Sequence, residues 1–100
     1  MEETTTKVRV QYLGLVKTYT KAGQDDLALQ KEAPLSQLLE KLAAKFGKPF
    51  DPEVYEPSKK EIKLMFTVMV NGIIIGQLND VDTKLKDGDT IIIMPLMTGG

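Results

Sequence analysis

One amphipathic helix in an otherwise extended chain is the feature that most constrains the fold. Between residues 35 and 46 the apolar positions recur three or four residues apart, which places them on one side of a helix. These positions are Leu35, Leu38, Leu39, Leu42 and Phe46. Pro34 suits the first turn, Ser36 is the alternative cap, and Gly47 is expected to end the helix in a left-handed conformation. A single apolar stripe can cover only one face of a sheet.

Strands are predicted on both sides of this helix. Residues 7–12 alternate strictly between polar and apolar side chains, which is typical of a half-buried strand. Residues 18–26 are polar and are expected to form a turn, followed by a second strand at 27–30 that completes a hairpin. Three of the five prolines lie in residues 48–63, so this segment is predicted to be a loop anchored by Phe50 and Tyr55.

The second half of the chain predicts another strand pair. Residues 64–71 are interpreted as a strand, Asn71-Gly72 as a tight turn, and residues 73–75 as its extended continuation. The last strand, residues 90–94, is apolar on both sides. That composition is typical of a central strand whose two faces are covered, and it favours parallel pairing with the first strand.

Together these elements predict an α+β fold of the β-grasp, or ubiquitin-like, type. We expect a mixed sheet of four to five strands with one main helix packed across one face. The predicted organisation is a frayed N-terminus over residues 1–6, the β-grasp domain over residues 7–95, and a flexible Gly-Gly tail over residues 96–100.

Composition removes most enzymatic chemistry. The chain has no Cys and no His, so it lacks thiolate nucleophiles, the usual general base and the commonest zinc ligands. Thirteen basic residues against fourteen acidic ones give a net charge of −1, which gives no indication of a nucleic-acid or membrane surface. No signal peptide is recognisable, and we expect a cytoplasmic protein that is not an enzyme on its own and binds no metal or cofactor.

Two further patterns concern chemistry. Asp87 and Asp89 could form an acid pair or a metal site, but Gly88 between them favours a turn. Gly99 and Gly100 lack Cβ atoms, so their backbone could enter a narrow channel and present a carboxylate to a reagent. The alternative is that these two glycines are an engineered or frayed terminus.

The last sixteen residues carry a resemblance to a known family. Residues 85–100 contain Leu-Lys-Asp-Gly-Asp, an apolar strand, Pro95 and a final Gly-Gly, and this run resembles the carboxy-terminal signature of the MoaD/ThiS sulfur carriers. Val70-Asn71-Gly72 and residues 34–39 resemble the hairpin and helix start of the same family. The sequence departs from many MoaD tails at Leu96, where those have a second proline, and it is longer than most ThiS proteins.

The resemblance implies that the protein is a carrier of sulfur. In this family a ubiquitin-activating-like enzyme uses ATP and Mg²⁺ to adenylate the terminal carboxylate, here that of Gly100. A persulfide sulfur then replaces AMP and leaves a thiocarboxylate. The closest likeness, to MoaD, implies the small subunit of molybdopterin synthase. The implied partners are the activating enzyme, the large synthase subunit and a sulfur-donor protein, with no nucleic acid and no membrane.

Residues that contact these partners can be predicted from the tail and the strands. Met97, Thr98 and Gly99 would thread into the activating enzyme ahead of Gly100. Met69, Met94 and Leu96 are predicted to dock on a partner, because one helix leaves the other sheet face uncovered and methionine suits an adaptable surface. The alternative is that residues 48–63 cover that face.

Other functions stay open on the sequence. The second hypothesis is a carrier for tRNA thiolation or a modifier that forms isopeptide bonds with lysines, and the third is a plain ubiquitin-like binding domain. The sequence does not determine the final sulfur acceptor.

Overall fold

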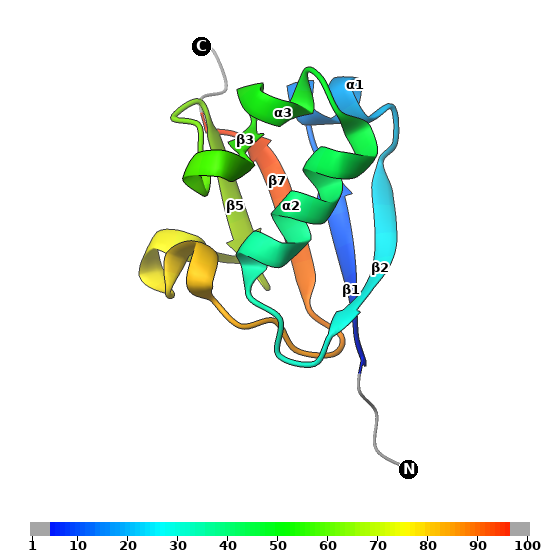
Figure 1. Ribbon diagram of the computed structural model, residues 1–100, viewed down its shortest axis with the longest axis vertical. Helices are drawn as coiled ribbons and strands as arrows, with labels where there is room; N and C mark the ends of the chain where they lie inside the picture. Colours follow the sequence, from blue (N-terminus) through cyan, green and yellow to red (C-terminus); the bar gives the residue numbers. More distant parts are fainter. Residues whose placement is uncertain (1–4, 97–100) are drawn as a thin grey trace.

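A five-stranded mixed sheet forms the centre of the computed structural model, which describes residues 5–96. Its strand order is β2-β1-β7-β5-β6, and the strands are β1 (Thr5–Tyr12), β2 (Gln24–Gln30), β5 (Phe66–Val70), β6 (Ile73–Ile74) and β7 (Thr90–Pro95). β1 and β7 pair in parallel at the centre, and the other pairs are antiparallel (Figure 1). The predicted β-grasp fold, with its parallel first and last strands, is confirmed.

The helix α2 (Leu35–Phe46) lies across one face of this sheet, as predicted (Figure 1). Its apolar stripe is buried against side chains that alternate along the strands. The fully buried side chains of the stripe are Leu35, Leu38, Leu39 and Leu42. Pro34, rather than Ser36, is the N-cap residue. Gly47 has the predicted positive φ of 62°, although its ψ of −146° lies outside the left-handed helical region.

Tyr12 connects the sheet to the end of this helix. Its ring is buried and packs edge-on against Phe46, with 5.7 Å between the ring centroids. Its hydroxyl donates a hydrogen bond of 2.9 Å to Asp25 Oδ2, and Asp25 also pairs with Lys45 at 3.2 Å. Burial, together with the Asp25 carboxylate, raises the pKa of the Tyr12 phenol. This group of side chains therefore connects β1, β2 and α2.

A short helix replaces part of the turn expected at residues 18–26. α1 (Leu15–Thr20) follows β1 directly, and β2 already begins at Gln24. Val16 is fully buried and anchors the helix to the core. At six residues, α1 is too short to show a helical repeat, so tertiary packing determines it.

The first strand also starts earlier than expected. β1 includes Thr5 and Thr6, which were predicted to belong to a frayed N-terminus. Both residues pair with β2, opposite Gln30 and Leu29, and Thr6 is buried. The rest of that segment, residues 1–4, lies outside the described residues.

Residues 48–63 contain regular structure and pack beside the helix. They comprise α3 (Phe50–Glu53), β3 (Tyr55–Glu56), the 3₁₀ turn η1 (Pro57–Lys59) and β4 (Glu61–Ile62). The predicted anchors Phe50 and Tyr55 are fully buried, and the Phe50 ring lies 6.0 Å from that of Phe46 on α2. The segment thus lies on the α2 side of the sheet (Figure 1), and the alternative that it covers the other face is wrong.

The remaining strand pair is shorter than predicted. β5 begins at Phe66 because Phe66 N–H closes a turn with the carbonyl of Lys63, which leaves Leu64 and Met65 outside the strand. β6 covers only Ile73–Ile74, and the chain then continues as the 3₁₀ turns η2 (Ile75–Gln77) and η3 (Asp80–Asp82).

Candidate functional site

The base of the C-terminal tail lies where β7 leaves the sheet. Pro95 pairs with Phe66 of β5, and Leu96 N–H donates a 2.7 Å hydrogen bond to the carbonyl of Met65. Leu96 is 57% exposed. The predicted tail residues Met97, Thr98, Gly99 and Gly100 lie outside the described residues. The structure therefore fixes the point from which the tail starts.

The predicted docking residues share one face of the sheet. Ile92 of β7 lies opposite Met69 of β5, and Met69 lies opposite Ile74 of β6. Met94 is two residues beyond Ile92 and therefore projects from the same side. The alternate residues of β7, Ile91 and Ile93, point to the other side of the sheet and are fully buried under α2. We call the apolar surface beside the tail base the open face; it consists of Met69, Ile74, Ile92, Met94 and Leu96.

Only one half of this sheet surface is apolar. Towards β2 the same side carries Arg9, whose Nε lies 2.9 Å from Asp26 Oδ1. The hydrogen bond from Arg9 holds the pKa of the exposed Asp26 carboxyl below its usual value. The open face is thus bordered by a charged half of the sheet on one side. Exposed Met65, just before β5, and exposed Leu13, just after β1, lie close to the tail base.

Asp87 and Asp89 form a turn, as the sequence favours. Asp87 Oδ1 accepts a 2.8 Å hydrogen bond from Lys7 N–H, and Asp89 Oδ2 accepts one of 2.8 Å from Lys86 N–H. Asp89 Oδ1 also accepts from Asn71 Nδ2 at 2.8 Å. Both carboxylates are therefore engaged in holding the backbone. Within residues 5–96 no three side chains form a cluster that could bind a metal ion.

Asn71 connects this turn to the hairpin between β5 and β6, and its loss should destabilise the fold. Its Oδ1 accepts a 2.9 Å hydrogen bond from Thr90 N–H, and its φ of 52° is one that asparagine tolerates better than alanine. We expect Asn71→Ala to lower the free energy of unfolding by about 1–2 kcal/mol. Urea unfolding measures the change. Asn71→Gly tolerates the same backbone conformation and should therefore lose less stability than Asn71→Ala. If Asn71→Ala were as stable as the wild type, the Asn71 side chain would not hold the turn to the hairpin.

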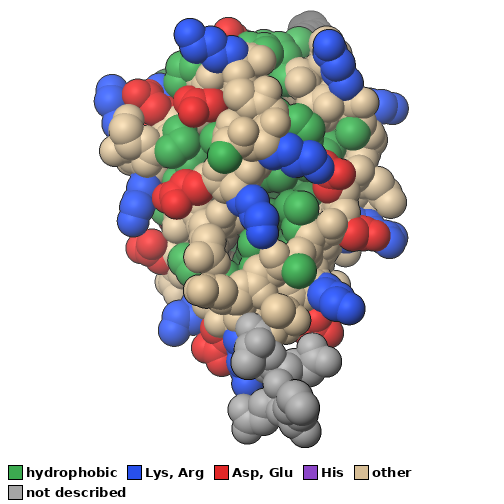
Figure 2. All heavy atoms as spheres, turned by 45° about the vertical axis from the view of Figure 1, so that its right-hand side comes forward, with side chains coloured by type: hydrophobic (Ala, Val, Ile, Leu, Met, Phe, Trp, Pro, Cys, Tyr) green, Lys and Arg blue, Asp and Glu red, His purple; other side chains and the backbone are tan. Residues whose placement is uncertain are grey.

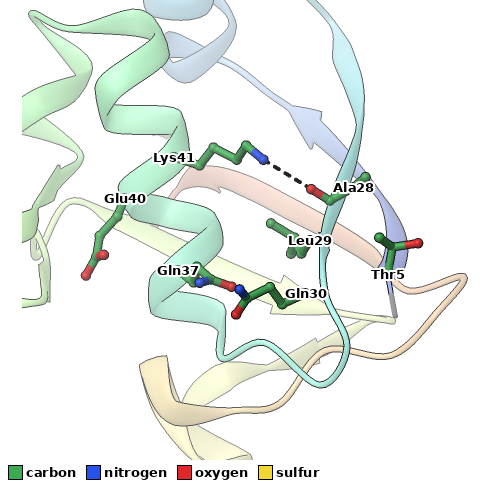
Figure 3. Close-up of a pocket in the computed structure, with 7 residues that line it drawn as sticks. All are labelled: Thr5, Ala28, Leu29, Gln30, Gln37, Glu40 and Lys41. Atoms are coloured by element: carbon green, nitrogen blue, oxygen red, sulfur yellow. Dashed lines mark hydrogen bonds between the residues drawn. The ribbon is translucent and has the colours of Figure 1, made fainter. Parts of the chain in front are cut away.

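A hollow on the surface lies away from the tail base. It measures about 850 Å³ and is lined by β2 and α2 residues together with Thr5 (Figure 3). Lys41 Nζ spans it and donates a 3.1 Å hydrogen bond to the carbonyl of Ala28, while the buried Gln37 Oε1 has no hydrogen-bond partner among the described residues. Charged side chains of both signs surround this side of the molecule (Figure 2). Thr5 begins β1, whereas Pro95 lies beyond the other end of that strand, so the hollow and the tail base are separate.

The fold, the open face and the tail base define a ubiquitin-like protein of the β-grasp class. The model of the ThiS family matches residues 10–100, and the chain therefore belongs to the ThiS family of ubiquitin-like sulfur carriers. Such small carriers are generally not catalysts themselves. A search of curated proteins finds no match. Within the described residues no helix is long and apolar enough to cross a membrane.

Solved structures share the fold. The Haloferax volcanii HVO 2177 protein is 20% identical with a TM-score of 0.82, and the alignment covers 100% of this chain and 92% of that one. A molybdopterin converting factor, subunit 1, from Pyrococcus furiosus is 24% identical with a TM-score of 0.73, and the alignment covers 92% of this chain and 99% of that one. The small archaeal modifier protein 1 from Methanosarcina acetivorans is 23% identical with a TM-score of 0.73 and coverages of 96% and 98%.

Proposed function

We propose that this protein carries sulfur as a thiocarboxylate on Gly100. The observation that supports this most directly is membership of the ThiS family over residues 10–100, combined with a Gly99-Gly100 tail that starts beside an apolar sheet face. Two residues without Cβ atoms let the backbone enter a channel too narrow for side chains. The chain has no His and no Cys, so its own contribution is the carboxylate and the surface that presents it.

The chemistry proceeds in two stages on an activating partner that supplies the ATP and Mg²⁺ site. A Gly100 carboxylate oxygen attacks the α-phosphorus of ATP, the bond to the β-phosphate oxygen breaks, and pyrophosphate leaves. The terminal sulfur of a persulfide then attacks the acyl carbon and AMP leaves. A thiol reductant cleaves the resulting acyl disulfide, which gives the thiocarboxylate. Activation is required because a free carboxylate is a poor electrophile.

The acceptor that we propose is a pterin precursor in molybdopterin synthesis. The chain would be the small, non-catalytic subunit of molybdopterin synthase, with the large subunit and a sulfur-donor protein as further partners. The MoaD-like sequence of residues 85–100 and the shared fold with the Pyrococcus furiosus converting-factor subunit support this choice. Because activation consumes ATP, we propose the cytoplasm as the compartment.

A modifier is the second candidate. The fold likeness to the Methanosarcina acetivorans modifier protein is as high as that to the converting-factor subunit, with TM-scores of 0.73 for both. A carrier for tRNA thiolation or lysine conjugation uses the same adenylation step. The candidates differ only in the nucleophile or acceptor that follows it.

Intact-mass spectrometry tests the proposal. The protein is incubated with ATP, Mg²⁺, a persulfide donor, a thiol and a candidate activating enzyme that is proven on another carrier. We expect a mass gain that corresponds to one oxygen exchanged for one sulfur. A lysine-linked adduct without that gain would support the modifier. An unchanged mass would support a plain ubiquitin-like binding domain.

We propose that the open face docks on the activating enzyme, because it adjoins the residue from which the tail leaves. Met69→Lys places a charge in the middle of this face while its aliphatic stem keeps part of the packing. We expect the KM for the carrier in ATP–pyrophosphate exchange to rise at least about tenfold, since an unpaired charge must be desolvated on docking.

Gln24→Lys is the matched control for this variant. Gln24 is an exposed residue of the edge strand β2, opposite Gln11 of β1. Substitution by lysine there adds the same charge at the polar edge of the sheet. Its KM should stay within about twofold of wild type. If Met69→Lys folds normally and has an unchanged KM, the open face is not the docking surface.

A further inference from the structure

Gly14 occupies a backbone conformation that favours glycine. It lies between β1, which ends at Tyr12, and α1, which begins at Leu15. Its φ is 57° and its ψ is −134°. A positive φ already disfavours side chains, and this ψ lies outside the left-handed helical region that asparagine or aspartate can adopt.

Gly14 also lies directly against the last residue of β7. A Cβ atom at Gly14 would lie 2.9 Å from Cγ and 3.0 Å from Cδ of Pro95, closer than carbon atoms approach without displacement. Because the pyrrolidine ring is closed onto the backbone nitrogen, its Cγ and Cδ atoms cannot rotate away about χ1 as those of an open side chain could. A side chain at position 14 would therefore displace Pro95 itself.

The strands on both sides hold Pro95 and the residues next to it in place. On the β1 side, Leu13 N–H donates a 3.1 Å hydrogen bond to the carbonyl of Ile93. On the β5 side, Pro95 pairs with Phe66, and Leu96 N–H bonds to the carbonyl of Met65. The end of β7 thus has neighbours on both edges, and displacement by a side chain at Gly14 would push it towards β5.

We propose that Gly14 is a positioning residue that sets the direction in which the tail leaves the sheet. This inference rests on the proposed function and extends it to the geometry of tail delivery. Residues 96–100 can span at most about 17 Å when drawn out in a partner's channel. A displacement of Pro95 shifts the point from which this segment starts relative to the open face, and it therefore shifts what the far end of the segment can reach. Misplacement by about 1 Å can slow a positioned reaction about 100-fold.

Gly47 provides a closely matched control. Its φ of 62° and ψ of −146° are nearly those of Gly14, and a Cβ atom there would meet nothing within 4 Å. Alanine at either position has the same backbone strain, but only alanine at position 14 contacts Pro95. Any difference between the two variants therefore reports the contact and not the strain.

The test measures ATP–pyrophosphate exchange on the full chain with its activating enzyme. We expect Gly14→Ala to lower kcat at least about tenfold with KM within about twofold, because Met69, Ile74 and Ile92, the open-face residues farther from Pro95, stay in place. Gly47→Ala should lower the melting temperature by less than Gly14→Ala does, because it has the backbone strain without the contact, and it should leave kcat within about twofold. The amide NMR signal of Leu96 should shift in Gly14→Ala and not in Gly47→Ala.

Replacing Pro95 by alanine removes the other partner of the contact. This second variant keeps the inference testable if Gly14→Ala alone folds poorly. In a Pro95→Ala background, the atoms that collide with the new methyl group are gone, so adding Gly14→Ala should change kcat less than about twofold. A tenfold loss in that background, or equal losses in Gly14→Ala and Gly47→Ala, would overturn the inference while the proposed function stands. A wild-type chain that is not activated would overturn both.

Discussion

A chain that lacks Gly100 will fold like the wild type and will not be activated. All the helices and strands of the described residues lie before Gly100, and the last of them, β7, ends at Pro95. In the proposed reaction the Gly100 carboxylate is the group that attacks ATP. Without it, the shortened chain presents its new terminus one residue too early for the partner's site. We expect ATP–pyrophosphate exchange to fall at least about 100-fold, with an unchanged melting temperature.

A second variant moves the terminal carboxylate in the opposite direction. Appending one alanine after Gly100 keeps every native residue but moves the carboxylate by about 3.5 Å. Exchange should fall to the same extent as in the shortened chain. Full exchange activity of either variant would contradict the role of Gly100 as the reacting residue.

Leu39→Ala should produce the largest loss of stability. Leu39 is fully buried at the centre of α2, in the core formed by the helix and the sheet. Truncation of a buried leucine removes apolar contacts and leaves a cavity, which destabilises by about 2–5 kcal/mol. That is a large fraction of the roughly 5–15 kcal/mol by which a domain is stable. Denaturant unfolding of both proteins, fitted with one common dependence of the unfolding free energy on denaturant concentration, measures the difference in stability.

The neighbouring residue Glu40 provides the control. It is exposed on the same turn of α2, and alanine is the best helix former, so Glu40→Ala should change stability by less than about 0.5 kcal/mol. If Leu39→Ala were as silent as Glu40→Ala, the assignment of Leu39 to the buried stripe would be wrong.

The parts of the fold that the sequence predicted are those with a long repeat. The stripe of α2 and the alternation in β1 each extend over several periods, so the helix and the central strands were predictable. The helix α1 was not predicted, because Val16 and Thr20 are its only buried residues and a single interval of four gives no period. The pairing of β3 with β4 joins two-residue strands and likewise leaves no pattern.

The candidate site was predictable in part. Met69, Met94 and Leu96 were assigned to an uncovered face because a single helix can cover only one side of the sheet. Ile74 and Ile92 belong to the same surface but were not identified. Ile92 could have been identified, because residues alternate between the two faces along β7 and Ile92 is two positions from Met94. Ile74 could not, because its place beside Met69 depends on the pairing register of β5 and β6. The contact between Gly14 and Pro95 joins residues far apart in the sequence, and nothing local to either residue indicates it.

The parallel pairing of β1 with β7 has a practical consequence for how the chain can be attached to other molecules. Many domains have neighbouring termini, but here the described ends, Thr5 and Leu96, lie at opposite ends of the sheet (Figure 1). A fusion partner, affinity tag or surface anchor placed before β1 is therefore remote from the residues that surround Pro95. A circular permutant would instead need a linker long enough to run the length of the sheet.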